Sequence, residues 1–394
     1  MNTFSIFPRK IYSPIILVSL IAVLGLSGCK PEPPAPELEV PSSYVFTRDG
    51  GLTVRFGDVL EQLNMLEEMS AYMAETERLN GDIEGDRLTA MFRNGIGADF
   101  QETYNKSLLS KTHPDASDML QLWMEEMGEA SVWQREAKEG QSGFLSETYG
   151  TGAIANSEHL GYLVNENGVV YQQIIEIGLM GAVFFHQAME NHLTKGNMGT
   201  TGNDERVETF FYTQMEHEFD AAFGYFGVPL DYPLGSEFTR FWGRMMDELS
   251  VGSNSGRFAF SSLSTDMMTS FLRGRAAISQ QMYSIRDEEI INIADQWNLV
   301  IGGTAADLLE QSKSTKNVKP YEKHHALSGA IACLMSLTYH EGISSKAAPS
   351  VDLSKIDEAL QMIGLETNLW QITDEEIEGV IQLIIGAYPA GTFG

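Results

Sequence analysis

The chain has 394 residues, with 54 acidic residues against 26 lysines and arginines, which gives a formal net charge of −28 at pH 7. So large a negative surplus argues against binding to nucleic acid and against adsorption to anionic lipid, because both surfaces attract basic proteins. The length is sufficient for a sizeable core, organised as one large domain or as two lobes.

The first residues have the pattern of an export signal. Arg9 and Lys10 precede the apolar run "IILVSLIAVLGL" at 15–26, which is too short to span a membrane comfortably. The run leads into Leu-Ser-Gly-Cys, which resembles the lipobox of bacterial lipoproteins. We therefore expect residues 1–28 to be a signal peptide and Cys29 to carry the lipid. The alternative is a short uncleaved anchor with a chance cysteine.

The residues after Cys29 predict a tether and a location. Lys30 follows the cysteine where some lipoproteins have aspartate, and by resemblance this favours the outer membrane of a Gram-negative bacterium. Residues 29–43 are rich in proline and are typical of a stiff, extended spacer. With Cys29 lipidated, only Cys333 remains, so no intrachain disulfide is possible. The apolar surroundings of Cys333 predict an inert buried thiol.

Residues 44–394 are expected to form an all-α domain. Helical patterning dominates, and the clearest strand pattern is "SYVFTR" at 43–48. The fold class predicted is therefore long packed helices arranged in one or two helical bundles. The helices are expected near 57–80, 114–139, 167–194, 204–226, 235–249, 264–313, 320–340 and 373–387.

One segment, 169–194, is apolar nearly all round, which predicts a central helix enclosed by others. Gly178 and Gly181 would let a neighbouring backbone approach this helix closely. Glu176 lies inside the same apolar segment, and a buried carboxylate must be paired, hydrogen-bonded or protonated. We favour the interpretation that Glu176 is paired for structural reasons over the alternative that it is exposed in a water-filled cleft.

The segment "MEHEFDAAFGYFGVP" at 215–229 raises the question of what its charged residues do. With 204–226 placed on one helix, Glu218 falls on the apolar face, while Glu216 and Asp220 point toward water. His217 lies at the border between the two faces.

A second charged residue interrupts an apolar stripe at 265–285. Arg275 lies within it, whereas Arg273 points elsewhere. A lone buried charge is costly, and arginine suits bidentate pairing with a carboxylate. We therefore predict that Arg275 pairs with an inward carboxylate, with Glu218 as first choice and Glu176 as second.

The functional alternative is a metal site. His217 and Glu218, together with inward histidines such as His186 and His324, offer ligand types that suit a transition metal. His186 and Glu190 also have the i,i+4 spacing that lets two side chains on one helix contact the same ion. A metal ion is therefore the one cofactor that the sequence suggests. Sequence spacing alone shows no convergence between helices.

Signatures of catalysis are missing from the sequence. It has no CxxC, HExxH, EF-hand, GxSxG, GxGxxG or Walker motif. We therefore assign no catalytic residue and favour a protein that is not an enzyme.

Three stretches resemble an uncharacterised family of bacterial lipoproteins that is classed as a domain of unknown function. They are "YVFTRDGGLTVRFGDVLEQLNMLEEMSAYM" at 44–73, "DAAFGYFGVPLDYP" at 220–233 and "KHHALSGAIACLMSL" at 323–337. That family is similar in style to the imelysin-like lipoproteins, which implies an all-α fold of two bundles and a role in iron or haem uptake. The imelysin group carries a GxHxxE motif that this sequence lacks, so no catalytic residue is carried over.

These features lead to one functional hypothesis and two alternatives. We expect a lipid-anchored, non-enzymatic envelope protein that binds a ligand or a protein partner, with metal or haem acquisition as the implied setting. The first alternative is a metal-dependent hydrolase of imelysin type, and the second is a scaffold of an outer-membrane complex. The binder needs a concave pocket, the hydrolase needs converging ligands, and the scaffold needs an exposed apolar patch.

Overall fold

The computed structural model describes residues 37–79, 81–146, 161–200, 202–252, 254–316, 318–340 and 351–393. Residues Leu38–Gly394 form one compact unit. The expected signal peptide, Cys29 and most of the tether lie outside the described residues.

The compact unit is all-α, as expected, with two small antiparallel strand pairs, β1–β2 and β3–β4, in its described part. The strands are β1 Thr47–Arg48, β2 Gly51–Leu52, β3 Gly143–Ser146 and β4 Gly161–Val164. The α-helices are α1 Gly57–Arg78, α2 Gly85–Arg93, α3 Pro114–Val132, α4 Tyr171–Leu179, α5 Lys195–Thr200, α6 Gln214–Phe226, α7 Phe241–Val251, α8 Leu263–Ser279, α9 Tyr283–Ser312, α10 Pro320–Leu337, α11 Leu353–Met362 and α12 Asp374–Ala387. Two π-helical segments, η2 Met180–Phe185 and η3 Gln187–His192, continue α4, and short 3₁₀ turns occur at η1 Leu109–Lys111, η4 Ser236–Phe238 and η5 Ser314–Lys316.

Several predicted elements agree with these bounds and others do not. The expected helices at 57–80, 320–340 and 373–387 match α1, α10 and α12 within a few residues. The single helix expected at 264–313 is two helices, because the chain turns at Gln281, where φ is 59°. The pattern at 43–48 yields only the short strand β1. The helices α2, α5 and α11 and the β3–β4 pair were not predicted.

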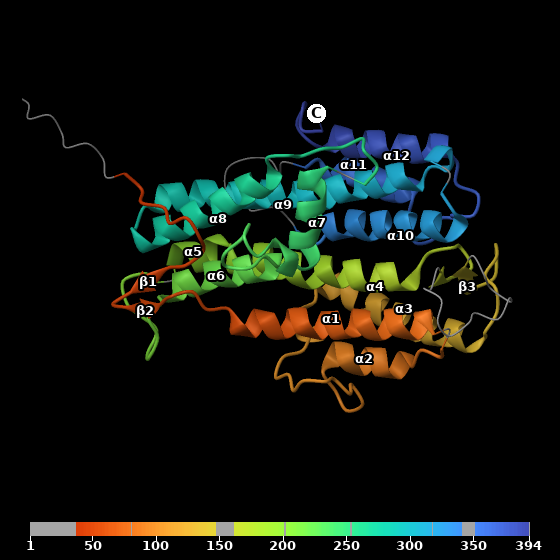
Figure 1. The fold of residues 1–394 in the computed structure, drawn as a ribbon, viewed down its shortest axis with the longest axis horizontal. Helices are drawn as coiled ribbons and strands as arrows, with labels where there is room; N and C mark the ends of the chain where they lie inside the picture. Colours follow the sequence, from red (N-terminus) through yellow and green to blue (C-terminus); the bar gives the residue numbers. More distant parts are fainter. Residues whose placement is uncertain are drawn as a thin grey trace, which may run out of the picture. The chain divides into compact units, whose positions relative to one another are not determined.

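The expected central helix is confirmed. The α4 helix packs against α1, α3 and α10, and its continuation η2 packs against α10 and α6 (Figure 1). A Cβ atom added to Gly181 would lie 2.8 Å from the Ser336 Cα, so α10 approaches closely at Gly181. The same atom on Gly178 would meet the Leu120 side chain at 3.0 Å, so only Gly181 admits a neighbouring backbone.

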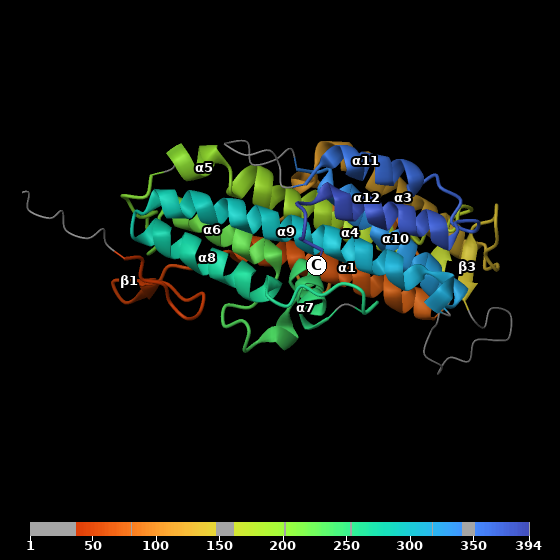
Figure 2. The same cartoon turned by 90° about the horizontal axis from the view of Figure 1, so that it is seen from above.

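A second layer of long helices covers this centre. The 30-residue α9 packs along both α8 and α10, and α12 packs on it from the other side. Figures 1 and 2 show these helices side by side in both views, with the shorter α7 running across them. A capping box formed by Thr373 and Glu376 begins α12. None of the helices in the described part of the chain combines the length and apolarity needed to cross a bilayer.

Candidate functional site

Arg275 is fully buried, as predicted, but its partners are not the predicted ones. Its Nε donates to Asp220 Oδ1 at 2.8 Å, and its Nη1 donates to Glu216 Oε1 at 2.9 Å. All three side chains are 0 % exposed. The prediction that Arg275 pairs with Glu218 or Glu176 is therefore wrong, and so is the prediction that Glu216 and Asp220 face water.

The error has a physical cause in where α6 begins. The expected helix started at 204, but α6 begins at Gln214, after Thr213 caps it through a capping box with Glu216. A helix starting at 204 would place Val207 and Phe211 on its apolar face, but both residues lie before α6, and Phe211 is exposed. From Phe219 onward α6 is buried on every side, because it packs against α1, α8, η2 and η3. A helix enclosed in this way has no solvent-exposed side on which its acidic residues could lie.

The charges around Arg275 form a buried network of ion pairs and hydrogen bonds. Arg48 of β1 reaches Glu216 with both terminal nitrogens, at 2.7 Å and 2.8 Å, and Tyr44 donates to Asp220 at 2.9 Å. Burial raises the pKa of Asp220 to about 6 although Arg275 opposes the shift. Burial acts the same way on Glu216, but the hydrogen bonds from Arg48 and the charge of Arg275 outweigh it and lower the pKa of Glu216. This network holds the N-terminal hairpin on the bundle and leaves no accessible group for a ligand.

Glu218 and Glu176 have other surroundings. Glu218 is partly buried and accepts a hydrogen bond from the His192 ring at 2.7 Å. Burial raises the pKa of Glu218, but His192 outweighs that effect and lowers it. Glu176 is also partly buried, and burial raises its pKa against the nearby positive charge of Arg244.

The metal-ligand candidates are separately engaged. The Nδ1 of His217 lies 2.8 Å from the Arg55 carbonyl oxygen, that of His186 lies 3.3 Å from the Tyr339 carbonyl oxygen, and that of His324 lies 2.6 Å from the Gly168 carbonyl oxygen. Within the described ranges, no group of three or more His, Cys, Asp or Glu side chains is placed to hold one metal ion. His217, Glu218, His186 and His324 are therefore not brought together there.

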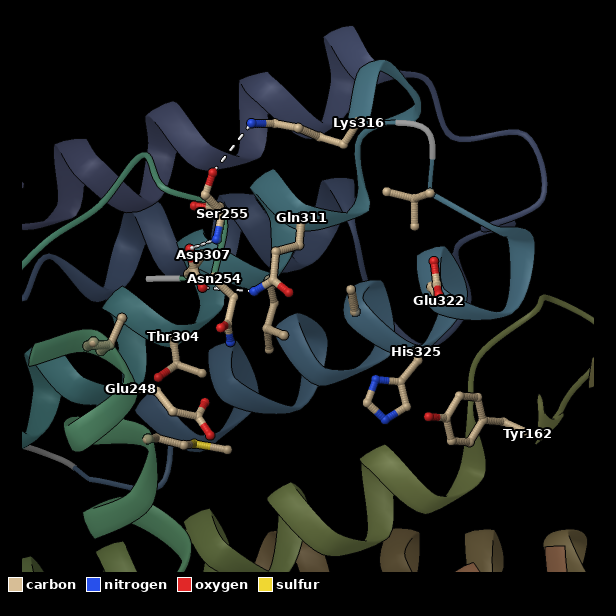
Figure 3. Close-up of a pocket in the computed structure, with 15 residues that line it drawn as sticks. Tyr162, Glu248, Asn254, Ser255, Thr304, Asp307, Gln311, Lys316, Glu322 and His325 are labelled. Carbon is tan, nitrogen blue, oxygen red and sulfur yellow. Dashed lines mark hydrogen bonds between the residues drawn. The ribbon is translucent and has the colours of Figure 1, made fainter. Parts of the chain in front are cut away.

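A different site is built where α7, α9 and α10 meet. A cavity of about 650 Å³ opens between these helices and is also lined by Tyr162 of β4. Its volume lies in the range of about 300–1,000 Å³ that is typical of small-molecule sites. Figure 3 shows Glu248 and Thr304 on one side of the cavity and His325 and Tyr162 on the other. Apolar lining comes from Met245, Leu249, Leu308, Val318 and Ala326.

Asp307 of α9 is the most deeply placed charge of this cavity, at 5 % exposure. Its Oδ1 accepts from the Ser255 amide at 3.1 Å, and its Oδ2 accepts from the Gln311 amide at 2.8 Å (Figure 3). Nearby, burial raises the pKa of Glu248 against the charge of Arg244, and the carboxylate of Asp307 adds to the rise. Two carboxylates therefore share one side of the cavity.

Thr304, one turn before Asp307 on α9, is 9 % exposed. Its hydroxyl has no hydrogen-bond partner among the described residues. A buried hydroxyl without a partner costs free energy, and a ligand in the cavity would supply one.

The two aromatic rings that line the cavity, those of Tyr162 and His325, are uncharged at neutral pH. The rings of Tyr162 and His325 lie 4.4 Å apart, centroid to centroid. Burial lowers the pKa of His325 to about 4, so its imidazole is neutral at physiological pH, and burial raises the pKa of Tyr162. These rings therefore offer flat apolar faces and polar ring atoms without a positive charge.

Most of the chain matches the model of a known protein family. The model of the family described as "Domain of unknown function (DUF4856)" matches residues 41–389, which is most of the chain. The chain belongs to this family. No curated protein and no solved structure matches it, so the likeness to imelysin-like lipoproteins is a resemblance that the comparisons do not show.

The residues of the cavity in this DUF4856 protein were missed by the sequence analysis. Of the pair at 324–325, His324 was expected to be the functional one, but His324 packs against Trp370 and His325 lines the cavity. A usable pattern was present in "GGTAADLLEQS", where Thr304, Asp307 and Gln311 recur at helical spacing in a largely apolar stretch. That stripe faces the cavity in the structure.

Proposed function

We propose that this protein is a lipid-anchored envelope protein that binds a small organic ligand in the cavity between α7, α9 and α10, without transforming it. The observation that carries the proposal is a cavity of about 650 Å³ with the unpartnered, buried Thr304 hydroxyl in its wall. The export pattern and lipobox at Cys29 support the location.

Binding is favoured over catalysis by the arrangement of the polar groups. A general base must lie within hydrogen-bond reach of the group that it activates. Thr304 and His325 stand on opposite sides of the cavity, so His325 is not placed to activate the Thr304 hydroxyl (Figure 3). A role in iron or haem uptake came from the imelysin-like resemblance. The cavity supports an organic ligand better, since the described residues offer no three-ligand metal cluster.

Blocking the cavity tests the binding function. Met245 lines the cavity and is partly buried, so Met245→Trp should fill it. The matched control is Met335→Trp on α10, which is also partly buried but does not line the cavity. The full chain is purified in detergent, and the unfolding temperature is measured against a panel of amines, sugars, carboxylates and haem. We expect at least one compound to stabilise the wild type and the control but not Met245→Trp.

The proposal fails if no compound separates Met245→Trp from Met335→Trp. It also fails if a purified wild-type protein converts the stabilising compound into a product under the same conditions, because the function would then be enzymatic.

Changing Cys29 to serine tests the lipid anchor. A serine cannot accept the thioether-linked lipid, so we expect Cys29→Ser to lose the added lipid mass and to appear in the soluble fraction. Intact-mass spectrometry and membrane fractionation measure both results, with Cys333→Ser as the control that keeps the anchor. A wild-type chain without lipid mass would contradict the prediction.

A further inference from the structure

Acidic residues outnumber basic residues in the lining of the cavity, and this restricts the chemical class of ligand that the cavity can bind. Among the described residues that line it, Glu248, Asp307 and Glu322 are acidic, and Lys316 alone carries a positive charge at neutral pH. Lys316 is engaged elsewhere, because its Nζ lies 3.6 Å from Glu310 Oε1 and donates to the Ser255 carbonyl oxygen at 3.4 Å. Glu248 and Glu322 are exposed, so Asp307 is the buried acid of the three, and no cation of the described lining pairs with it.

Two acidic residues of α9, Glu310 and Asp307, differ in whether the chain supplies them with a cationic partner. Glu310 is surrounded by cations, since Arg257 and Lys313 contact Glu310 Oε2 at 2.8 Å and 2.7 Å. Asp307 lies one turn earlier and is more than nine-tenths buried, yet its hydrogen-bond donors in the described chain are the neutral amides of Ser255 and Gln311. A buried carboxylate without a counter-ion is unfavourable, and a cationic ligand would relieve that cost.

Extending the proposed function, we infer that the cavity binds an organic cation, a molecule that carries ammonium or guanidinium groups on an apolar chain. One cationic group lies between Asp307 and Glu248 and donates a further hydrogen bond to the Thr304 hydroxyl. The apolar chain lies along Met245 and Leu308 toward the faces of Tyr162 and His325. A second cationic group reaches Glu322 at the aromatic side of the cavity.

The placement of the acids favours an organic cation over a metal ion. Figure 3 shows Glu248 and Glu322 on different sides of the cavity, which suits charges that are separated along a chain. A metal ion needs several ligands at about 2.0–2.6 Å, and the described residues do not form such a group. The face of Tyr162 adds an aromatic surface that attracts ammonium and guanidinium groups.

Two kinds of molecule carry such cationic groups on an apolar chain. One is a free diamine or polyamine, and the other is the side chain of a lysine or arginine residue. Isothermal titration of the full chain in detergent separates them with putrescine, cadaverine and spermidine in one arm and with lysine amide and arginine amide in the other. The control compound is 1,4-butanediol, which matches putrescine in length and lacks its charge. We expect one arm to bind and the diol to give no heat.

Charge-removing variants test where the cation binds. Asp307→Asn keeps an acceptor for the Ser255 amide and should weaken binding by roughly 10-fold or more. Glu248→Gln and Thr304→Val should each weaken it by about 3- to 10-fold, since each removes one contact to the cation. Glu288→Gln, an exposed acid on the same helix outside the cavity, should leave the affinity within about 2-fold. If Asp307→Asn does not fold, the other two variants carry the test.

Three outcomes would be decisive. The inference is overturned if the amines bind wild type, Asp307→Asn and Glu248→Gln equally well. It is also overturned if magnesium displaces the amines equally readily from all three proteins. Either result would show that the amines are attracted only to the acidic surface. A neutral or anionic compound that binds the wild type and not Met245→Trp would overturn it while leaving the proposed binding function intact. The absence of any compound sensitive to Met245→Trp would overturn both.

Discussion

Replacing Arg275 by methionine is expected to lower the free energy of unfolding by about 3–5 kcal/mol at pH 8, because it leaves a buried carboxylate without its partner. Glu216 would keep its two hydrogen bonds from Arg48. Asp220 would keep only the Tyr44 hydroxyl, and its Oδ2 already has no partner in the described chain. The cost therefore falls mainly on Asp220.

Urea unfolding of the wild type and variants measures this effect. Arg78→Met is the control, since Arg78 of α1 is 42 % exposed and its partner Glu75 is also exposed, at 59 %. It should cost no more than about 1 kcal/mol. The double variant Arg275→Met with Asp220→Asn should recover part of the loss, because the unpaired charge is then gone. A loss for Arg275→Met that is as small as that for Arg78→Met would show that the network is not stabilising.

Replacing Glu77 by glutamine is expected to change how stability depends on pH. Glu77 is 1 % exposed, and burial raises its pKa to about 8 although the Leu163 amide donates to its Oε1 at 2.9 Å. The unfolded chain has a glutamate pKa of about 4.3, so between about pH 4.5 and 8 the folded state holds a proton that the unfolded state has released. This contribution to stability is complete below that window, falls steadily across it and is gone above about pH 8.

Glutamine keeps an acceptor for the Leu163 amide but cannot ionise. The free energy of unfolding of Glu77→Gln, relative to the wild type, should therefore rise with pH by up to about 1.4 kcal/mol per unit between pH 5 and 8. Urea unfolding at pH 5, 6.5 and 8 measures the difference. Glu129→Gln, an exposed acid on α3, is the control and should give a difference that does not vary with pH. A flat difference for Glu77→Gln would contradict an elevated pKa.

Much of the fold could be predicted from local patterns. The helix after 169 was recognisable because an all-apolar circumference can be buried only in the centre of a bundle. The capping box at Thr373 and the burial of Cys333, which is 0 % exposed, were likewise predictable. Each of these features depends on residues within a few turns of one another, and that information is local to the sequence.

The charged residues were harder because their partners are remote. The sequence indicated that Arg275 is buried and must be paired, and both conclusions are confirmed. Its partners could not be chosen, because the start of α6 decides which side of that helix meets α8. Arg48, the second arginine that binds Glu216, lies 168 residues from it along the chain.

By itself the sequence determined the all-α class, the central helix and the need to neutralise Arg275. Only the tertiary structure decided which acids neutralise Arg275 and which polar residues share a cavity. Tyr162, Glu248, Asp307 and His325 come from β4, α7, α9 and α10, and their convergence depends on how those elements pack. Periodicity fixes which side of a helix is apolar, whereas the meeting of two polar stripes depends on packing contacts between helices that are distant in the chain.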